Sequence, residues 1–254
     1  MRQNWPERLW LVRHGQSQGN VARDAADEAG AHEIDIDMRD VDVPLSNLGV
    51  EQAKAAGRWF AALPLDERPE IILSSPYVRA RQTAEIICEQ GALSGAKART
   101  LLDERLRERE FGIFDRLTVL GIRERFPEEA AHRKRLGKFY HRPPGGESWA
   151  DVIFRLRSML NTINLHYCDR RVLVVCHQVV VLCFRYILEE LHEQTILSIE
   201  RQAEILYCGI AAYDFEHDNK GVCVPDLNLW NYGAPLEAEG APKTSAPDAM
   251  AGTR

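Results

Sequence analysis

Residues 11–20 read LVRHGQSQGN and carry the clearest signal in the chain. They continue a short aliphatic run, residues 9–12, of the kind that forms strands buried on both faces of a parallel sheet. The run ends abruptly at Arg13 and His14. Because ligands of open α/β sheets bind at the carboxyl ends of the strands, we expect both side chains at a binding edge. Taken alone, His14 has an equally good structural explanation, since a strand-end histidine can simply bond a nearby carbonyl group.

Other strand signals are spread along the chain. Residues 71–73 and 172–176 are short aliphatic runs that predict two more buried strands. Residues 205–215 and 221–229 resemble two β runs separated by the polar turn 217–220. We expect this pair to add strands at an edge of the sheet.

Helix signals lie between the strand signals. Apolar residues at spacings of three and four predict a helix over 149–167, with Ser148 and Asp151 as a capping box at its start. Ser46 precedes a second helical stretch, and a third follows Pro76. Alternation of strands and helices predicts the α/β class.

The chain is organised as one domain with a tail. Its 254 residues and 28.9 kDa suit a single large domain, which we place at residues 1–233. From Ala234 onward the composition shifts to small and polar residues, so we expect residues 234–254 to be a disordered C-terminal tail. No internal repeat and no glycine-rich phosphate loop of the GxGxxG or GxxxxGK[ST] type occurs.

Charge and cysteine usage narrow the class of function. The net charge of −6 argues against nucleic acid as a partner, so local arginines must capture any anionic substrate. The longest apolar run has six residues, which predicts no membrane span and no secretory leader. The six cysteines form no CxxC pair and are expected to be buried thiols of a reducing compartment. We therefore expect a cytoplasmic protein; its oligomeric state stays open.

Four further positions complete a candidate site around His14. His177 follows the predicted strand 172–176, so both imidazoles can point into one crevice. Arg79 falls in the first turn of the helix after Pro76, and Glu108 precedes an aromatic-glycine turn. Singly, Arg79 would be read as a solvated helix face and Glu108 as surface charge. Together with Arg13, these residues form an inventory suited to phosphoryl transfer through a covalent histidine.

The motifs resemble those of the histidine phosphatase superfamily, which includes cofactor-dependent phosphoglycerate mutases and fructose-2,6-bisphosphatases. The family motif RHGx[ST]xxN matches residues 13–20 without a gap, and SSPxxRAxQTA matches residues 74–84. The stretch DVPLSNLG at 42–49 resembles the entry to the family's first helix. The likeness covers roughly residues 8–215. It implies a mainly parallel sheet with helices on both faces.

The resemblance also implies roles for individual residues. Neutral His14 is the nucleophile, and Glu108 occupies the family's proton-donor position. Arg13, Arg79 and His177 would surround the phosphoryl oxygens. Asn20, Ser17, Gln178 and Arg142 are the candidate substrate-binding residues. We expect neither a metal nor a cofactor, because the other histidines appear scattered (His32, His132, His141, His166, His192 and His217).

The back half of the chain is most similar to the fructose-2,6-bisphosphatase branch, with Pro-x-Gly-Glu-Ser before Cys-His-Gln. Two positions depart from that branch: Leu182 replaces a substrate-binding arginine, and Pro143 replaces a tyrosine. The loop over residues 24–40 is longer and more acidic than usual for the family. Such acid would repel highly charged substrates or close over the site.

Three functions remain open on the sequence. We favour a phosphatase that hydrolyses a small phosphorylated metabolite. A phosphoglycerate mutase is the alternative, and its extra cations would come from the basic run 132–135 with Lys138 and Arg142, although such runs are usually solvated helix faces. A non-catalytic phospho-ligand binding module is the third possibility, and the intact set of site residues argues against it.

Overall fold

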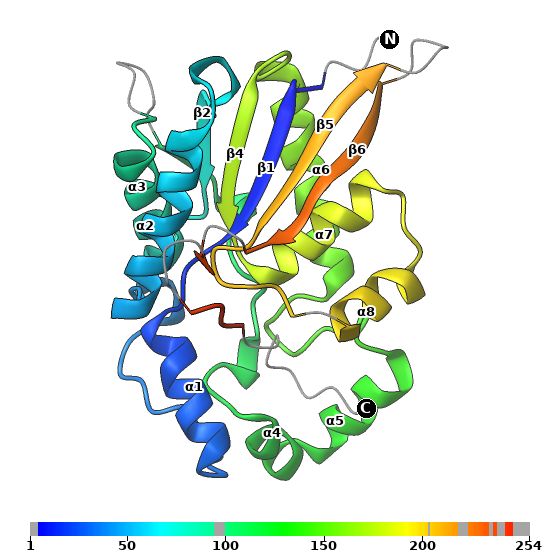
Figure 1. Ribbon diagram of the computed structural model, residues 1–254. Coiled ribbons are helices and arrows are strands. Elements are labelled where there is room, and N and C mark those ends of the chain that lie inside the picture. Colours follow the sequence, from blue (N-terminus) through cyan, green and yellow to red (C-terminus); the bar gives the residue numbers. More distant parts are fainter. Residues whose placement is uncertain are drawn as a thin grey trace.

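The protein, examined as a computed structural model, is described over residues 5–93, 100–202, 204–217, 223–233, 236–237 and 242–245. Six strands form one sheet in the order β3-β2-β4-β1-β5-β6 (Figure 1). β1, β4, β2 and β3 run parallel, whereas β5 is antiparallel to β1 and β6 to β5. The strands are β1 Arg8–Arg13, β2 Ile71–Ser74, β3 Thr100–Leu102, β4 Arg171–Cys176, β5 Ile210–His217 and β6 Cys223–Tyr232.

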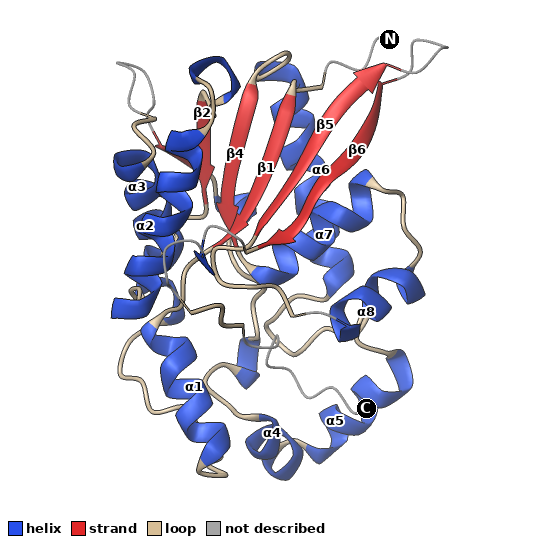
Figure 2. Ribbon diagram, in the orientation of Figure 1, coloured by secondary structure: helices blue, strands red, loops and turns tan. Residues whose placement is uncertain are grey.

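Eight α-helices are described, together with four short 3₁₀ turns. The helices are α1 Gln18–Glu28, α2 Asn47–Ala62, α3 Val78–Gln90, α4 Val119–Arg125, α5 Pro127–Leu136, α6 Trp149–His166, α7 Gln178–Leu188 and α8 Glu193–Gln202. The 3₁₀ turns are η1 Asp40–Asp42, η2 Leu65–Glu67, η3 Glu104–Leu106 and η4 Gly112–Phe114. Figure 2 shows helices on both faces of the sheet, as expected, with α1, α4 and α5 beyond the carboxyl ends of β1 and β4.

The two faces of the sheet have separate cores. Successive side chains of a strand point to opposite faces, and β1 divides accordingly. Leu9 and Leu11 join α6 and α7 in one cluster, whereas Trp10 and Val12 join α2 and α3 in the other. All four are at most 1% exposed. The prediction of strands buried on both faces is confirmed.

Most predicted elements appear with small shifts at their ends. The capping box of Ser148 and Asp151 starts α6, and Ser46 caps α2. The expected β pair forms β5 and β6 at one edge of the sheet, but β5 begins at Ile210 and not at residue 205. Residues 218–222 of the turn between them lie outside the described residues.

Of the tail at 234–254 that we expected to be disordered, six residues are described, and these lie against the domain. Leu236 is fully buried in the cluster formed with α2 and α3. The amide nitrogen of Gln52 donates to Thr244 Oγ1 at 2.8 Å and to the carbonyl of Pro242 at 3.2 Å. The overall composition of the tail gives no indication of the burial of Leu236 or of these polar contacts. The other tail residues lie outside the described part of the chain.

Two further expectations concern cysteines and membranes. The five cysteines whose side chains the structure describes are free thiols. Cys176, Cys183 and Cys208 are buried as expected, whereas Cys88 and Cys168 are partly exposed. Within the described ranges, no helix has the length and hydropathy to cross a bilayer.

Candidate active site

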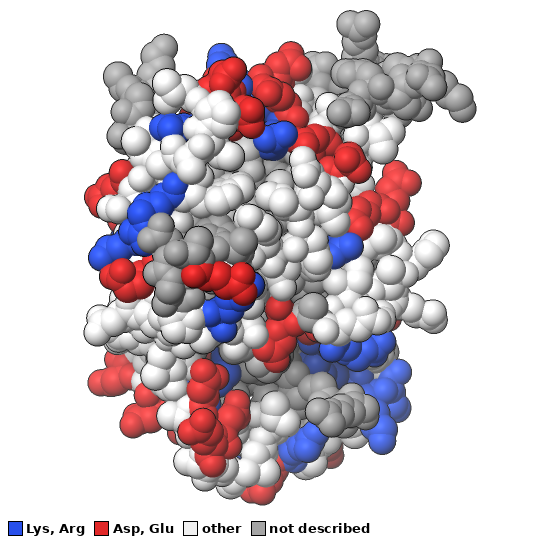
Figure 3. All heavy atoms as spheres, viewed as in Figure 1, with Lys and Arg blue, Asp and Glu red and all other residues white. Residues whose placement is uncertain are grey.

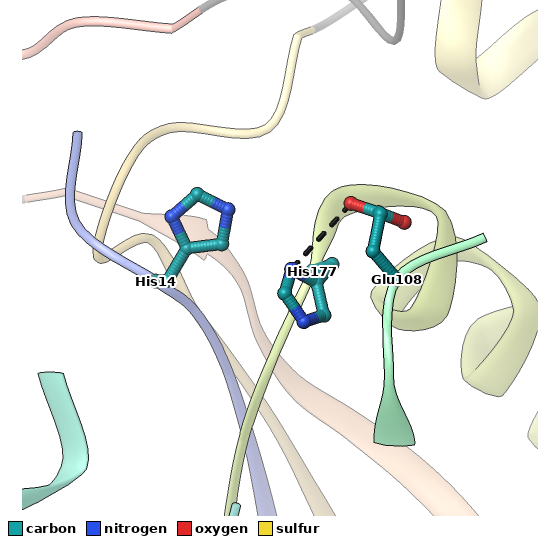
Figure 4. Close-up of side chains that lie close together, drawn as sticks. All are labelled: His14, Glu108 and His177. Carbon is teal, nitrogen blue, oxygen red and sulfur yellow. Dashed lines mark ion pairs between the residues drawn. The ribbon is translucent and has the colours of Figure 1, made fainter. Parts of the chain in front are cut away.

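Two histidines converge because two neighbouring parallel strands end in register. Arg13 of β1 pairs with Cys176 of β4, and each is followed directly by a histidine. The backbone N–H of His14 donates to the Cys176 carbonyl at 2.9 Å, which extends the ladder one residue further. The ring centroids of His14 and His177 are 5.1 Å apart, with the rings inclined at 64° (Figure 4). The convergence expected from the sequence is present.

His14 is held as a neutral imidazole with a defined tautomer. Its Nδ1 lies 2.7 Å from the carbonyl oxygen of Gly15, which can only accept, so Nδ1 carries the proton. Nε2 therefore bears the lone pair. Burial, followed by the positive charges of Arg79 and Arg13, holds the pKa of His14 well below its ordinary value of 6.5. A buried neutral imidazole with a free Nε2 lone pair can act as a nucleophile.

His177 lies between Glu108 and Ser75. Its Nδ1 is 3.5 Å from Glu108 Oε2 (Figure 4). Its Nε2 is 2.8 Å from the Ser75 hydroxyl. Burial, followed by the charge of Arg79, lowers the pKa of His177 as well. His177 is fully buried and is not among the residues that line the pocket. In this structure His177 contacts the Glu108 carboxylate and does not face the space where a phosphoryl group would bind.

Glu108 sits on a loop that ion pairs fix in place. Glu147 accepts hydrogen bonds from Arg155 Nε at 3.0 Å and from Arg107 Nη2 at 2.6 Å. Arg155 also donates to the backbone carbonyl of Glu108 at 3.3 Å. The Glu108 carboxylate accepts from the backbone N–H of Arg109 at 2.8 Å. The Glu of the Pro-Gly-Gly-Glu-Ser stretch thus positions the candidate proton donor, a role that sequence reasoning missed.

Arg13 and Arg79 are both nearly buried, with 4% and 5% of their surface exposed. The guanidinium of Arg13 lies over the ring of Tyr207 at 4.1 Å and donates to the carbonyl of Ile205. Arg79 donates to Asp40, whose carboxylate the sequence analysis had treated only as part of an acidic loop. Both arginines are therefore fixed before any substrate binds.

The histidine and both arginines border a pocket with about 730 Å³ of space, counted out to its open mouth. This size suits a metabolite. Ser17, Asn20 and Gln178 also line it, as expected. The side-chain oxygen of Asn20, Oδ1, accepts from both the backbone N–H and the hydroxyl of Ser17. The side-chain nitrogen, Nδ2, is thereby left for a ligand. Gln178 is 4% exposed, and in the described part of the chain its Oε1 has no hydrogen-bond partner.

One wall of the pocket comes from residues 34–40, which we call the strap. Its sequence, IDIDMRD, alternates in exposure: residues 35, 37 and 39 are exposed, whereas Ile34, Ile36 and Met38 line the pocket. Most of the acid in the loop therefore faces solvent, and only Asp40 turns inward. Residues 24–28 of the expected acidic loop belong to α1, and three of the four strap side chains that line the pocket are apolar. The period-two alternation was the signal that sequence reasoning overlooked.

Arg142 is placed away from the other candidates. It pairs with Asp151 through Nε at 2.7 Å, is largely exposed, and is not among the pocket residues. The basic run 132–135 lies on α5, where Figure 3 shows Lys and Arg gathered on the surface. None of its side chains lines the pocket either. Leu182 is buried in the core and is not among the pocket residues.

Among the described residues, two sets of side chains are close enough to share an ion, with ligand atoms within 4.8 Å of one another. The first is His14, Glu108 and His177, but the adjacent arginines make this position favour an anion. The second is Glu129, His132 and His141, which lie on α5 and the loop after it. His132 and His141 are thus not scattered as the sequence suggested. None of these three residues lines the pocket.

Comparison with known proteins places this site in a family. Residues 9–224 match the model of the histidine phosphatase superfamily, branch 1. The chain belongs to this superfamily, as its motifs predicted.

Individual relatives differ in name and in length. A phosphoglycerate mutase-like protein, AT74, of Arabidopsis thaliana is 33% identical over 62% of this chain, which covers only 46% of that protein. A 2,3-bisphosphoglycerate-dependent phosphoglycerate mutase of Azorhizobium caulinodans is 32% identical, covering 78% of this chain and 90% of the mutase.

Solved structures share the fold. A mycobacterial glucosyl-3-phosphoglycerate phosphatase complexed with inorganic phosphate has a TM-score of 0.67 at 24% identity, over 90% of this chain and 99% of that one. A putative α-ribazole-5′-phosphate phosphatase of Escherichia coli has a TM-score of 0.69 at 19% identity, over 90% and 97%. At these identities the likeness shows the phosphoglycerate mutase-like fold alone.

Proposed function

We propose that the protein is a phosphatase that hydrolyses a small phosphomonoester through a phosphohistidine at His14. The observation that carries the proposal is the state of His14: buried, neutral, protonated on Nδ1, and bordering a pocket with two arginines. An imidazole in this state attacks phosphorus without first losing a proton. Membership in a superfamily of phosphatases and mutases supports the enzymatic role.

The first step forms a bond between His14 Nε2 and phosphorus and breaks the bond from phosphorus to the ester oxygen. Glu108, protonated at that point, gives its proton to the departing oxygen, so an alcohol leaves. In the second step Glu108 takes a proton from water, whose oxygen attacks phosphorus. His14 leaves as the neutral imidazole, and orthophosphate is released.

The remaining residues stabilise charge on the phosphoryl oxygens. Arg13 and Arg79 border the pocket beside His14, and the Asn20 amide nitrogen is a further donor. Removing one such donor typically costs about 2.7–4 kcal/mol of transition-state stabilisation. His177 takes part through its contact with Glu108 and, if its side chain shifts toward the pocket, as a donor. The chemistry needs no metal, because His14 supplies the nucleophile and the arginines supply the positive charge.

The charge balance of the pocket favours hydrolysis over mutase transfer. Its titratable side chains are four arginines and three carboxyl groups, of which Glu108 is neutral when it acts as the acid: Arg13, Arg23, Arg79 and Arg116, with Asp40, Glu108 and Asp115. A mutase must retain a bisphosphate that carries two phosphoryl groups. The strong excess of positive charge that would hold such an anion is missing from this set. The phosphomonoester dianion is the better match.

Phosphoglycerate mutase activity stays the second candidate, because relatives of that name match most of this chain. Arg23 and Arg116 are the cations beyond the catalytic pair that it would use, in place of the α5 run. A binding module without catalysis is the third candidate, and cytoplasmic location stays a prediction from the cysteines.

One experiment separates these functions. Purified protein is incubated with a panel of phosphorylated metabolites that includes 3-phosphoglycerate with bisphosphoglycerate, and inorganic phosphate and isomerised product are both measured. Phosphate release that survives a chelator and is inhibited by vanadate supports the phosphatase. Isomerisation outpacing release would establish the mutase, and neither product from any compound would leave a binding module.

A further inference from the structure

The strap offers a continuous apolar surface to whatever is attached to the phosphoryl group. Ile34 is 6% exposed, and Ile36 and Met38 are half-buried along the same edge of the pocket. Val43 and Phe111 are further apolar residues of the lining. The side chains of Ile34, Ile36 and Met38 offer no hydrogen-bond donor or acceptor, so a hydroxyl group packed against them would lose water at a cost.

The strap is fixed in place by bonds at both ends and in its middle. The Ile34 N–H donates to the Arg116 carbonyl at 2.8 Å, and Arg116 Nη2 donates to the Met38 carbonyl at 3.0 Å. Asp40 closes the far end on Arg79. The apolar wall therefore exists before a ligand arrives, so little binding energy is spent on ordering it.

Beyond the phosphoryl end, the pocket sets one carboxyl group, Asp115, against two arginines, Arg23 and Arg116. Asp115, half-buried, lies in the electrostatic field of both Arg116 and Arg23. Asp40 occupies one end of Arg79. This part of the pocket thus holds no large excess of positive charge for a second anionic group on the substrate.

We infer that the alcohol portion of the substrate is an uncharged apolar group, alkyl or aromatic, that packs on Ile34, Ile36 and Met38. This inference rests on the proposed phosphatase activity and goes on to name the class of leaving group. Sugar phosphates and phosphoglycerates, whose alcohols are polar or charged, are accordingly poor ligands.

Straight-chain alkyl phosphates test the inference, because their leaving groups have nearly the same basicity and differ only in apolar surface. From ethyl to hexyl phosphate, kcat/KM should rise about threefold to fourfold for each methylene that reaches the strap. Glycerol 3-phosphate, matched in length to propyl phosphate, should be the poorer of those two substrates. The n-alkyl phosphonates, which cannot be hydrolysed, should show the same trend in Kd by calorimetry.

Met38→Gln is the critical variant, since glutamine keeps the length of methionine but is polar. We expect the gain in kcat/KM to fall below about twofold per methylene in this variant. Ile36→Asn should act in the same direction. Asp37→Asn is the matched control on the outward side of the strap, and it should leave the series unchanged.

The outcomes separate the inference from the function on which it rests. Equal rates along the ester series, or glycerol 3-phosphate outperforming propyl phosphate, would overturn the inference while leaving the phosphatase intact. No phosphate release from any ester would refute the phosphatase, and the phosphonate Kd values would still decide whether the strap prefers apolar groups. A trend that persists in Met38→Gln and Ile36→Asn would also refute the role of the strap.

Discussion

Asp40 holds one end of the Arg79 guanidinium. Its carboxylate accepts from Nη1 at 2.9 Å and from Nη2 at 3.1 Å, and its backbone carbonyl accepts from Nη1 at 2.7 Å. The carboxylate and the backbone carbonyl of Asp40 therefore occupy the side of the guanidinium formed by Nη1 and one proton of Nη2. The opposite edge, Nε with the second proton of Nη2, makes no hydrogen bond to the described residues. Arg79 is therefore anchored by Asp40 while retaining two donors in the geometry that phosphoryl oxygens require.

Asp40→Asn should separate the binding of phosphate from turnover. Removing a negative charge beside Arg79 should strengthen inhibition by inorganic phosphate about fivefold, the equivalent of the ~1 kcal/mol between unit charges ~4 Å apart in water. Loss of the anchor should lower kcat about tenfold or more, because misplaced catalytic groups are costly. Steady-state kinetics with phosphate as inhibitor measures both, with Asp37→Asn as control. Unchanged inhibition would mean that the Asp40 charge does not reach the phosphoryl site.

His14→Ala should abolish turnover, because His14 is the one histidine among the described residues that lines the pocket. Wild-type protein quenched in acid-free denaturant during turnover should carry phosphate that is labile to acid and stable to base. His192→Ala, at an exposed position, should keep full activity. Full activity in the His14 variant would refute the assignment of the nucleophile.

Glu108→Gln tests the proton donor through the leaving group. An alkyl phosphate needs its departing oxygen protonated, so single-turnover phosphorylation of His14 should slow by most of the ~10²–10⁴-fold that general acid catalysis contributes. A nitrophenyl phosphate leaves as a stabilised anion, and its phosphorylation step should change much less. Equal losses on both esters would remove Glu108 from this role. Attention would then turn to Glu110, which accepts from the Tyr77 hydroxyl at 3.1 Å.

The lowered pKa values of His14 and His177 predict how pH acts on activity and stability. Free enzyme should keep kcat/KM through pH 6.5 and lose it only below, once the ionisation of the substrate is corrected for. Between 6.5 and the lowered values, the unfolded chain binds protons that the folded protein does not. The free energy of unfolding should therefore decrease as pH is lowered through that window, by up to about 1.4 kcal/mol per pH unit for each histidine. Urea titrations should show a shallower fall in His177→Asn, and an unchanged slope would contradict the cause.

Leu236→Ala should destabilise the fold without altering the chemistry. Leu236 is fully buried against α2 and α3, so the cavity should cost about 2–5 kcal/mol of unfolding free energy. Urea denaturation measures the loss, and kcat should stay within about twofold. Leu165→Ala, 76% exposed on α6, is the control and should change stability by less than about 0.5 kcal/mol. A change as small as the control would show that the buried position contributes little.

Features that depend only on residues close together in the sequence, such as strand ends and helix starts, were predicted correctly. The proximity of His14 and His177 could be predicted from the sequence, because parallel strands end at one edge of the sheet and each histidine directly follows its strand. Helix starts at Ser46 and Ser148 were visible because capping needs only three or four residues.

Contacts between distant segments were not predictable in the same way. Asp40 and Arg79 are 39 positions apart, and nothing near either residue indicates the other. Arg142 looked available to a substrate until the fold brought Asp151 beside it. The burial of Leu236 was not predicted, because the composition of residues 234–254 is dominated by small and polar residues. Each of these outcomes depends on tertiary packing, which single-sequence patterns do not encode.

The strap also bears on how this enzyme can diverge. Its inward side chains at positions 34, 36 and 38 are carried by a surface segment, whereas His14 and His177 are fixed at the end of the buried sheet. On the proposed function, mutation of those three positions would change which alcohol fits and leave the chemistry in place. A duplicated copy of the gene could acquire a new substrate by drift at these three positions, with Asp40 as the member of the segment that selection must retain.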